Sequence, residues 1–86
     1  MAADYLKESA QRDPIGRLLV TVHRFGTSGR MAAVAKEVDL SEREFMSAIA
    51  EAEWGGLLKR IEEQGAVFLT LTAQGQARAE AIMRPS

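Results

Sequence analysis

Hydrophobic residues recur at helical spacing in three stretches of the chain, and turn residues separate these stretches. The first stretch follows Asp13, which can cap a helix, and Pro14 suits the first helical position. The loop "GTSG" ends this helix at Gly26, and Thr27 or Ser28 can cap the next one. The pattern therefore predicts helices over residues 14–25, 30–38 and 41–54.

The third helix has the clearest start, because Ser41 and Glu44 show the three-residue spacing of a capping box. Asp39 and Leu40 form the short turn before it. In each helix the apolar residues fall on one side, which we expect to be buried. The predicted buried positions are Ile15, Leu18, Leu19, Val22, Phe25, Met31, Val34, Ala35, Val38, Phe45, Ala48, Ile49 and Ala52.

After Gly55–Gly56 the pattern changes from helical spacing to alternation, which is typical of strands. Gln64–Gly65 provides a turn between two such strands, and Thr72 can cap a last helix. This Ala-rich helix can pack on the first helix of the same chain or pair with a partner helix. The expected elements are strands over residues 57–63 and 66–72, a helix over residues 73–83, and a further short helix over residues 2–11.

Three segments, in this order, resemble the winged helix-turn-helix fold of bacterial and archaeal regulators, the broad group that contains the MarR-like and PadR-like families. "AAVAKEVDLSEREF" is similar to the helix-turn-helix core, and "WGGLLKRIE" to the passage from the reading helix into the first wing strand. "FLTLTAQGQA" is similar to the second wing strand followed by a Leu-Thr-x-x-Gly start of the final helix. The resemblance spans Asp13 to Met83 within a single domain of residues 1–86. It implies an α+β, mostly helical fold with a three-helix core, a two-stranded wing and a C-terminal helix.

Composition narrows the functional classes. Of the 86 residues, 47% are hydrophobic and 27% are charged, which excludes the composition typical of disorder. The formal net charge of −1 is not the strongly basic balance of many nucleic-acid-binding domains. No apolar run approaches the roughly 20 residues of a membrane span, and the N-terminus does not read as a secretory signal. We therefore expect a cytoplasmic protein that does not enter a membrane.

The sequence offers no set of residues suited to catalysis. It contains no cysteine and one histidine, His23, so thiolate sites and the common zinc sites are absent. No paired acid and base, phosphate-binding loop or Ser–His–Asp spacing is present. We expect a protein that is not an enzyme and has no catalytic residues, metal or cofactor.

The helix over residues 41–54 is acidic, because it contains four glutamates and a single cation, Arg43. Successive residues turn by about 100°, so the side opposite Phe45 and Ile49 faces outward. The glutamates fall on its two flanks, Glu42 and Glu53 on one and Glu44 and Glu51 on the other. The outward stripe therefore has no carboxylate and can enter a groove; it consists of Arg43, Ser47, Ala50 and Trp54.

From this stripe and the resemblance we predict a small sequence-specific DNA-binding protein that regulates transcription. The helix over residues 41–54 would enter the major groove, and the wing over residues 57–72 would lie on the backbone. Arg43 and Ser47 would contact bases, since the first turns of such a helix reach deepest. Lys59 and Arg60 are adjacent strand residues that point to opposite faces, so one of them can reach phosphate. The predicted DNA-binding residues are Arg30, Lys36, Arg43, Ser47, Lys59 and Arg60, with Arg24 as a further cation.

Symmetric operators usually require two copies, so we expect a homodimer joined through the terminal helices. The residues do not separate duplex DNA from RNA as the target. The alternative is a protein–protein interaction module on the same fold, favoured by the acidic helix and by Trp54 and Met46 near its surface. We expect Trp54 to fold onto the wing strands and seal the core; in the alternative it is an exposed anchor for a partner.

Overall fold

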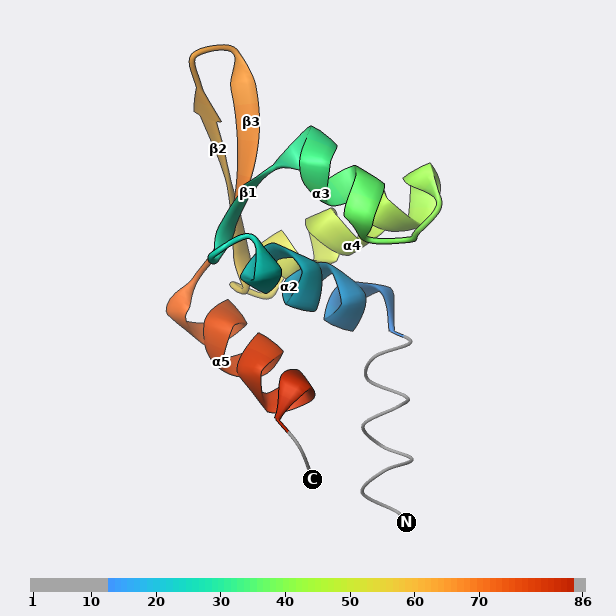
Figure 1. The fold of residues 1–86 in the computed structure, drawn as a ribbon, viewed down its shortest axis with the longest axis vertical. Coiled ribbons are helices and arrows are strands. Elements are labelled where there is room, and N and C mark those ends of the chain that lie inside the picture. Colours follow the sequence, from blue (N-terminus) through green and yellow to red (C-terminus); the bar gives the residue numbers. More distant parts are fainter. Residues whose placement is uncertain (1–12, 85–86) are drawn as a thin grey trace.

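A computed structural model describes residues 13–84, and the helix predicted over residues 2–11 lies outside this range. The predicted helices and strands within it are all present, and each end lies within one residue of its expected position. The first strand lies between α2 and α3, and the hairpin of β2 and β3 follows α4 and projects from the helical body (Figure 1). The elements are α2 (Pro14–Arg24), β1 (Ser28–Arg30), α3 (Met31–Glu37), α4 (Glu42–Trp54), β2 (Leu58–Glu63), β3 (Ala66–Leu71) and α5 (Ala73–Met83).

The sequence pattern does not predict β1, which pairs antiparallel with β3 and gives the sheet the order β1-β3-β2. The expectation that Thr27 or Ser28 caps α3 is wrong. Ser28 instead pairs with Thr70 in the ladder, where their hydroxyl oxygens share a hydrogen bond at 2.8 Å. Arg30 takes the N-cap position of α3 without a side-chain cap. Three residues between two helices are too few to show a period, so the pattern contains no strand signal here.

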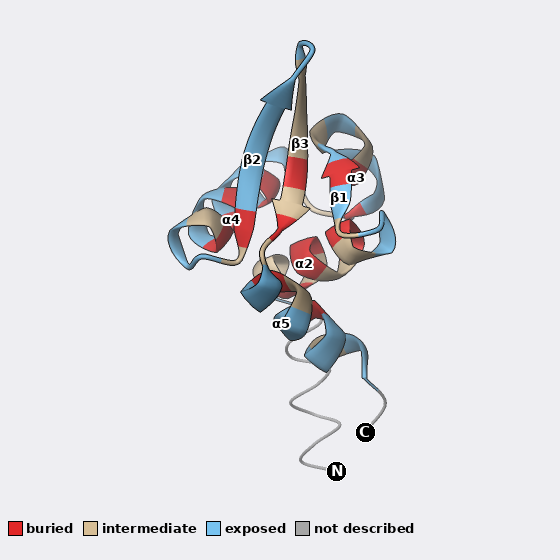
Figure 2. Cartoon of the chain, turned by 90° about the vertical axis from the view of Figure 1, so that its left-hand side faces the viewer, coloured by how far each residue is buried: buried red, intermediate tan, exposed pale blue. Residues whose placement is uncertain are grey.

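The core lies between α2, α4 and the inner face of the sheet, with α3 and α5 packed around it (Figure 2). Two residues predicted to be buried are exposed instead. Ala35 faces solvent on α3. Phe25 ends α2 and packs over Gly29, where an added Cβ would lie 2.9 Å from it. The buried apolar residues are Leu18, Leu19, Val22, Val34, Val38, Phe45, Ala48, Ile49, Ala52, Leu58, Leu69, Leu71 and Ala79.

The turn between α3 and α4 makes these helices a helix-turn-helix. Asp39 adopts a left-handed backbone conformation with φ of 54°, and Leu40 packs against the core. The predicted capping box is confirmed: the Glu44 N–H donates to Ser41 Oγ at 3.1 Å, and the Ser41 N–H donates to Glu44 Oε1 at 3.2 Å. The carboxylate also complements the positive end of the helix dipole. The start and direction of α4 are therefore set by its own first turn.

The last helix starts at a close junction with the loop before the wing. The Gly75 N–H donates to Thr72 Oγ1 at 3.0 Å, which confirms the predicted cap. The Thr72 hydroxyl donates to the Gly56 carbonyl at 2.7 Å, and the Thr72 N–H donates to the Leu57 carbonyl at 3.1 Å. Gly75 is buried against this loop, and a Cβ there would overlap the Leu57 carbonyl oxygen, so the position requires glycine. The Leu-Thr-x-x-Gly pattern thus has a steric cause.

The helix α5 packs on α2 of the same chain, one of the two arrangements that its small residues allow. Gly75 and Ala79 are the buried residues of α5, whereas Ala73, Ala77 and Ala81 face solvent. A homodimer through the terminal helices stays a prediction.

Replacing Gly75 by alanine should destabilise the fold. The new Cβ collides with the backbone of Leu57, which is held by the Thr72 N–H, so the junction must open. We expect the free energy of unfolding to fall by about 2 kcal/mol or more. Urea unfolding followed by circular dichroism measures this, with Arg78→Ala on the exposed side of α5 as the control. An unchanged unfolding midpoint for Gly75→Ala would contradict the close junction.

Candidate nucleic-acid interface

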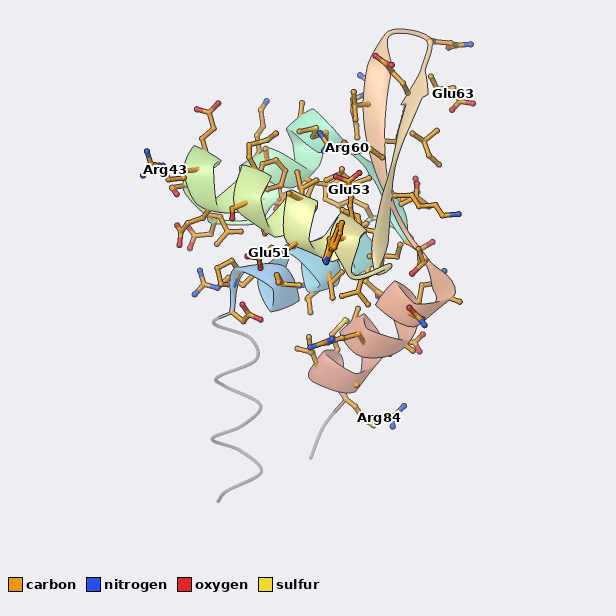
Figure 3. All side chains as sticks on the ribbon, turned by 180° about the vertical axis from the view of Figure 1, so that it is seen from behind. Arg43, Glu51, Glu53, Arg60, Glu63 and Arg84 are labelled. Carbon is orange, nitrogen blue, oxygen red and sulfur yellow. The ribbon has the colours of Figure 1, made fainter. Side chains whose placement is uncertain are left out.

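The outward stripe of α4 is arranged as predicted. Arg43, Ser47, Ala50 and Trp54 are exposed, while the opposite side of the helix, from Phe45 to Ala52, supplies four buried residues. Figure 3 shows Arg43 at the end of α4 farthest from the wing, pointing away from the body of the molecule. The stripe therefore presents one cation and one hydroxyl near the start of the helix and an indole at its end.

Two of the four α4 glutamates have partners within the chain. Glu44 is held by the capping box, and Glu53 accepts hydrogen bonds from Arg60 Nε at 3.0 Å and Nη2 at 2.6 Å. The hydrogen bond to Glu53 raises the pKa of Arg60 above its usual value, so the Arg60 guanidinium stays charged. Figure 3 shows the two side chains turned toward each other between α4 and the wing. Glu42 and Glu51 are exposed and carry their charge into solvent.

The flank of α4 that faces α2 is acidic. A hollow of about 410 Å³ lies there between α4 and the start of α2, and Arg43 and Ser47 line it. Asp13, Glu44 and Glu51 line the same hollow, so three carboxylates surround a single cation. A phosphate approaching from this side meets net negative charge.

The flank of α4 that faces the wing is mostly apolar. A groove of about 710 Å³ separates α3 and α4 from the hairpin, and its charged lining residues are Arg30 and Glu42. Met31, Phe45, Met46 and Val67 are among its apolar walls. Glu53 also lies on this flank, but Arg60 compensates its charge. The groove itself is therefore near neutral, whereas Glu62 and Glu63 place negative charge toward the tip of the hairpin.

The structure brings only some of the predicted cations together. Arg30 and Lys59 share the outer face of the sheet, since they pair with Phe68 and Thr70, two residues apart on β3. The Arg30 guanidinium lies over the Phe68 ring, 5.9 Å from its centroid. Arg60 pairs with Leu69 and so points to the inner face, toward Glu53.

Two further cations lie elsewhere. Lys36 is exposed on α3, next to the groove residue Ala35. Arg24 lines a separate hollow with Glu37, which no α4 residue borders. The cations available near α4 and the wing are therefore Arg30, Lys36, Arg43 and Lys59.

The expectation that Trp54 seals the core is wrong, because its side chain is 94% exposed. Ala52 takes the last buried position of α4, Gly55 ends the helix, and Leu57 and Leu58 fill the space beneath the wing. Met46 is 41% exposed on the groove side. The structure thus shows the indole in solvent at the end of α4, the arrangement expected of an anchor for a protein partner.

Comparisons with known proteins support the fold. No protein-family model and no curated protein sequence matches this chain. The crystal structure of SSV1 F-93 superposes on it with a TM-score of 0.74, covering 80% of each chain at 22% sequence identity. The chain has a winged helix-turn-helix fold. The narrower likeness to MarR-like or PadR-like regulators stays a prediction.

Among residues 13–84, no three His, Cys, Asp or Glu side chains are grouped as a metal site would require. None of the helices in this range is long and apolar enough to cross a membrane.

The exposure of Trp54 can be tested by fluorescence, since it is the one tryptophan of the chain. An indole in water emits at long wavelength, so we expect the native emission maximum to lie close to that of the unfolded chain. Iodide should quench native and unfolded protein to similar extents. A native spectrum shifted strongly to the blue would contradict the position of Trp54 described above.

Proposed function

We propose that this chain binds double-stranded DNA and regulates transcription in the cytoplasm, without catalytic activity. The observation that carries the proposal is the orientation of α4, which buries Phe45 and Ile49 and exposes Arg43 and Ser47 on a carboxylate-free stripe. The helix enters the major groove, and Arg43 and Ser47 reach base edges. Because the α2 flank is acidic, the phosphate backbone lies toward the wing, where Arg30 at the groove and Lys59 on the outer face of the hairpin contact it.

The small number of available cations sets the strength of binding. About three phosphate contacts give a slope near −3 for the logarithm of the binding constant against that of salt concentration. Arg60 adds little, because Glu53 already holds its guanidinium. Non-specific affinity is therefore weak and disappears at moderate salt. Binding of two copies to a symmetric DNA site raises the affinity, and the predicted dimer interface is formed by the terminal helices.

Titration of labelled duplex DNA tests the proposal. A duplex selected from a random pool should bind wild-type protein, and Arg43→Ala should weaken this binding about tenfold or more through loss of a base contact. Lys59→Ala should weaken all duplexes alike and reduce the salt slope by about 1. Arg78→Ala removes the same charge from α5, away from α4 and the wing, and serves as the control.

Absence of binding to any duplex near about 20 mM salt would overturn the proposal. Duplex RNA of the same sequence, run in parallel, identifies the preferred nucleic acid.

The exposed Trp54 favours a second candidate function, docking to another protein through the end of α4. Tryptophan is over-represented at the energetic centres of protein interfaces. Trp54 is 94% exposed, and contact of its apolar surface with water is unfavourable, so burial against a partner would be favourable. Met46 on the neighbouring flank extends the apolar surface.

Arg43→Ala and Trp54→Ala discriminate the two functions. Loss of duplex binding in Arg43→Ala supports DNA recognition. Loss of a protein partner in Trp54→Ala, with Arg43→Ala indifferent, supports docking. Both variants change exposed side chains, so circular dichroism should show an unchanged fold in each.

A further inference from the structure

The free edge of the wing carries a charge pattern that is complementary to itself. β2 lies at the rim of the sheet, and every residue of β2 after Leu58 is exposed (Figure 2). Residues 59–63 read "KRIEE", two cations and two carboxylates on either side of Ile61. Reversing the direction of this strand exchanges its positive and negative positions.

Antiparallel pairing of β2 with the same strand of a second copy has one favourable register. When Ile61 faces its counterpart, Lys59 faces Glu63 of the second copy and Arg60 faces Glu62. Opposite charges directly across a ladder are stabilising, and like charges are destabilising. A slip of one residue sets the outer face of one strand against the inner face of the other. A slip of two residues sets Arg60 against Arg60 or Glu62 against Glu62.

Charged residues on an edge strand normally prevent pairing, because identical copies repel each other. That protection requires charges of one sign, or an order that brings like charges together. In β2 the antiparallel order brings Lys59 and Glu63 together twice and places the apolar Ile61 at the centre. Arg60 also faces Glu62, but its guanidinium is already held by Glu53. The same feature that usually blocks an edge therefore promotes its pairing here.

The contacts within the chain leave this edge available. Among residues 13–84, Arg60 forms an ion pair with Glu53, and His23 Nε2 lies 3.7 Å from Glu80 Oε1. Neither contact involves Lys59, Glu62 or Glu63. Lys59 and Glu63 lie on the outer face of the sheet, since they pair with Thr70 and Ala66 on β3. Figure 3 shows Glu63 near the wing tip, on the side away from α4. The Lys59–Glu63 contact can thus form without breaking an ion pair between described residues.

We propose that two copies of this chain associate by antiparallel pairing of their β2 strands, which joins two three-stranded sheets into one. The association is weak, since a single strand edge buries far less than the roughly 1,600 Å² of a standard interface. This inference is independent of DNA binding. Lys59 cannot hold phosphate and a second copy's Glu63 at the same time, so the test is made without DNA.

Sedimentation over a concentration series up to millimolar chain, at low salt, measures the association. Lys59→Glu and Glu63→Lys each convert two attractive contacts of the pair into repulsive ones, so each should raise the dissociation constant about tenfold or more. Mixing the two variants should restore association, because one then carries only acidic and the other only basic groups at these two positions. Lys36→Glu makes the same charge change on α3 and is the matched control for self-association.

Three results would overturn the proposal. One is a wild-type chain that sediments as a monomer at all these concentrations. Another is association that persists in both single variants, which would place the contact elsewhere, such as at the terminal helices. The third is loss of association in both variants with no recovery on mixing. Thermal unfolding of each variant verifies that the exposed substitutions leave the fold intact.

Discussion

Burial of one side of α4 is the constraint on which the surface of this molecule depends. Burying a phenylalanine or isoleucine side chain stabilises a fold by about 1.5–3 kcal/mol each, whereas an exposed ion pair contributes about 1 kcal/mol or less. Packing of Phe45 and Ile49 therefore decides how α4 is rotated, and the charges on its surface must follow. Ala48 and Ala52 occupy the same buried side and leave room for α4 to lie close to α2. The outward position of Arg43 is a consequence of this core.

The charge that a ligand meets on this surface depends on which charged side chains are paired with one another, more than on the net charge of the chain. A formal charge of −1 suggests a poor ligand for a polyanion, but the acid is unequally placed. Asp13, Glu44 and Glu51 gather on the side toward α2, and on the wing side Arg60 compensates Glu53. The Glu53–Arg60 pair adds little to stability because both side chains are partly exposed. Its effect is to remove one acid and one base from the surface that a ligand meets.

The helices, the wing and the outward stripe could be predicted because each follows from spacing within one segment. The capping box at Ser41 and Glu44 and the cap at Thr72 are signals of a few residues, and both are confirmed. What could not be predicted depends on contacts between distant segments. β1 exists only because β3 offers it a partner, and Arg60 meets Glu53 only because the turn at Gly55–Gly56 folds the wing back onto α4. The exposure of Trp54 likewise depends on how Leu57 and Leu58 fill the space beneath the hairpin.

The junction at Thr72 connects the last helix to the foot of the wing through hydrogen bonds. Thr72 directly follows β3, caps α5 and is hydrogen-bonded to both Gly56 and Leu57, just before β2 begins. Because Gly75 has no side chain, α5 packs directly against the backbone of Leu57. The same hydrogen bonds and close contact thus fix both the direction of α5 and the position of the residues from which the hairpin rises.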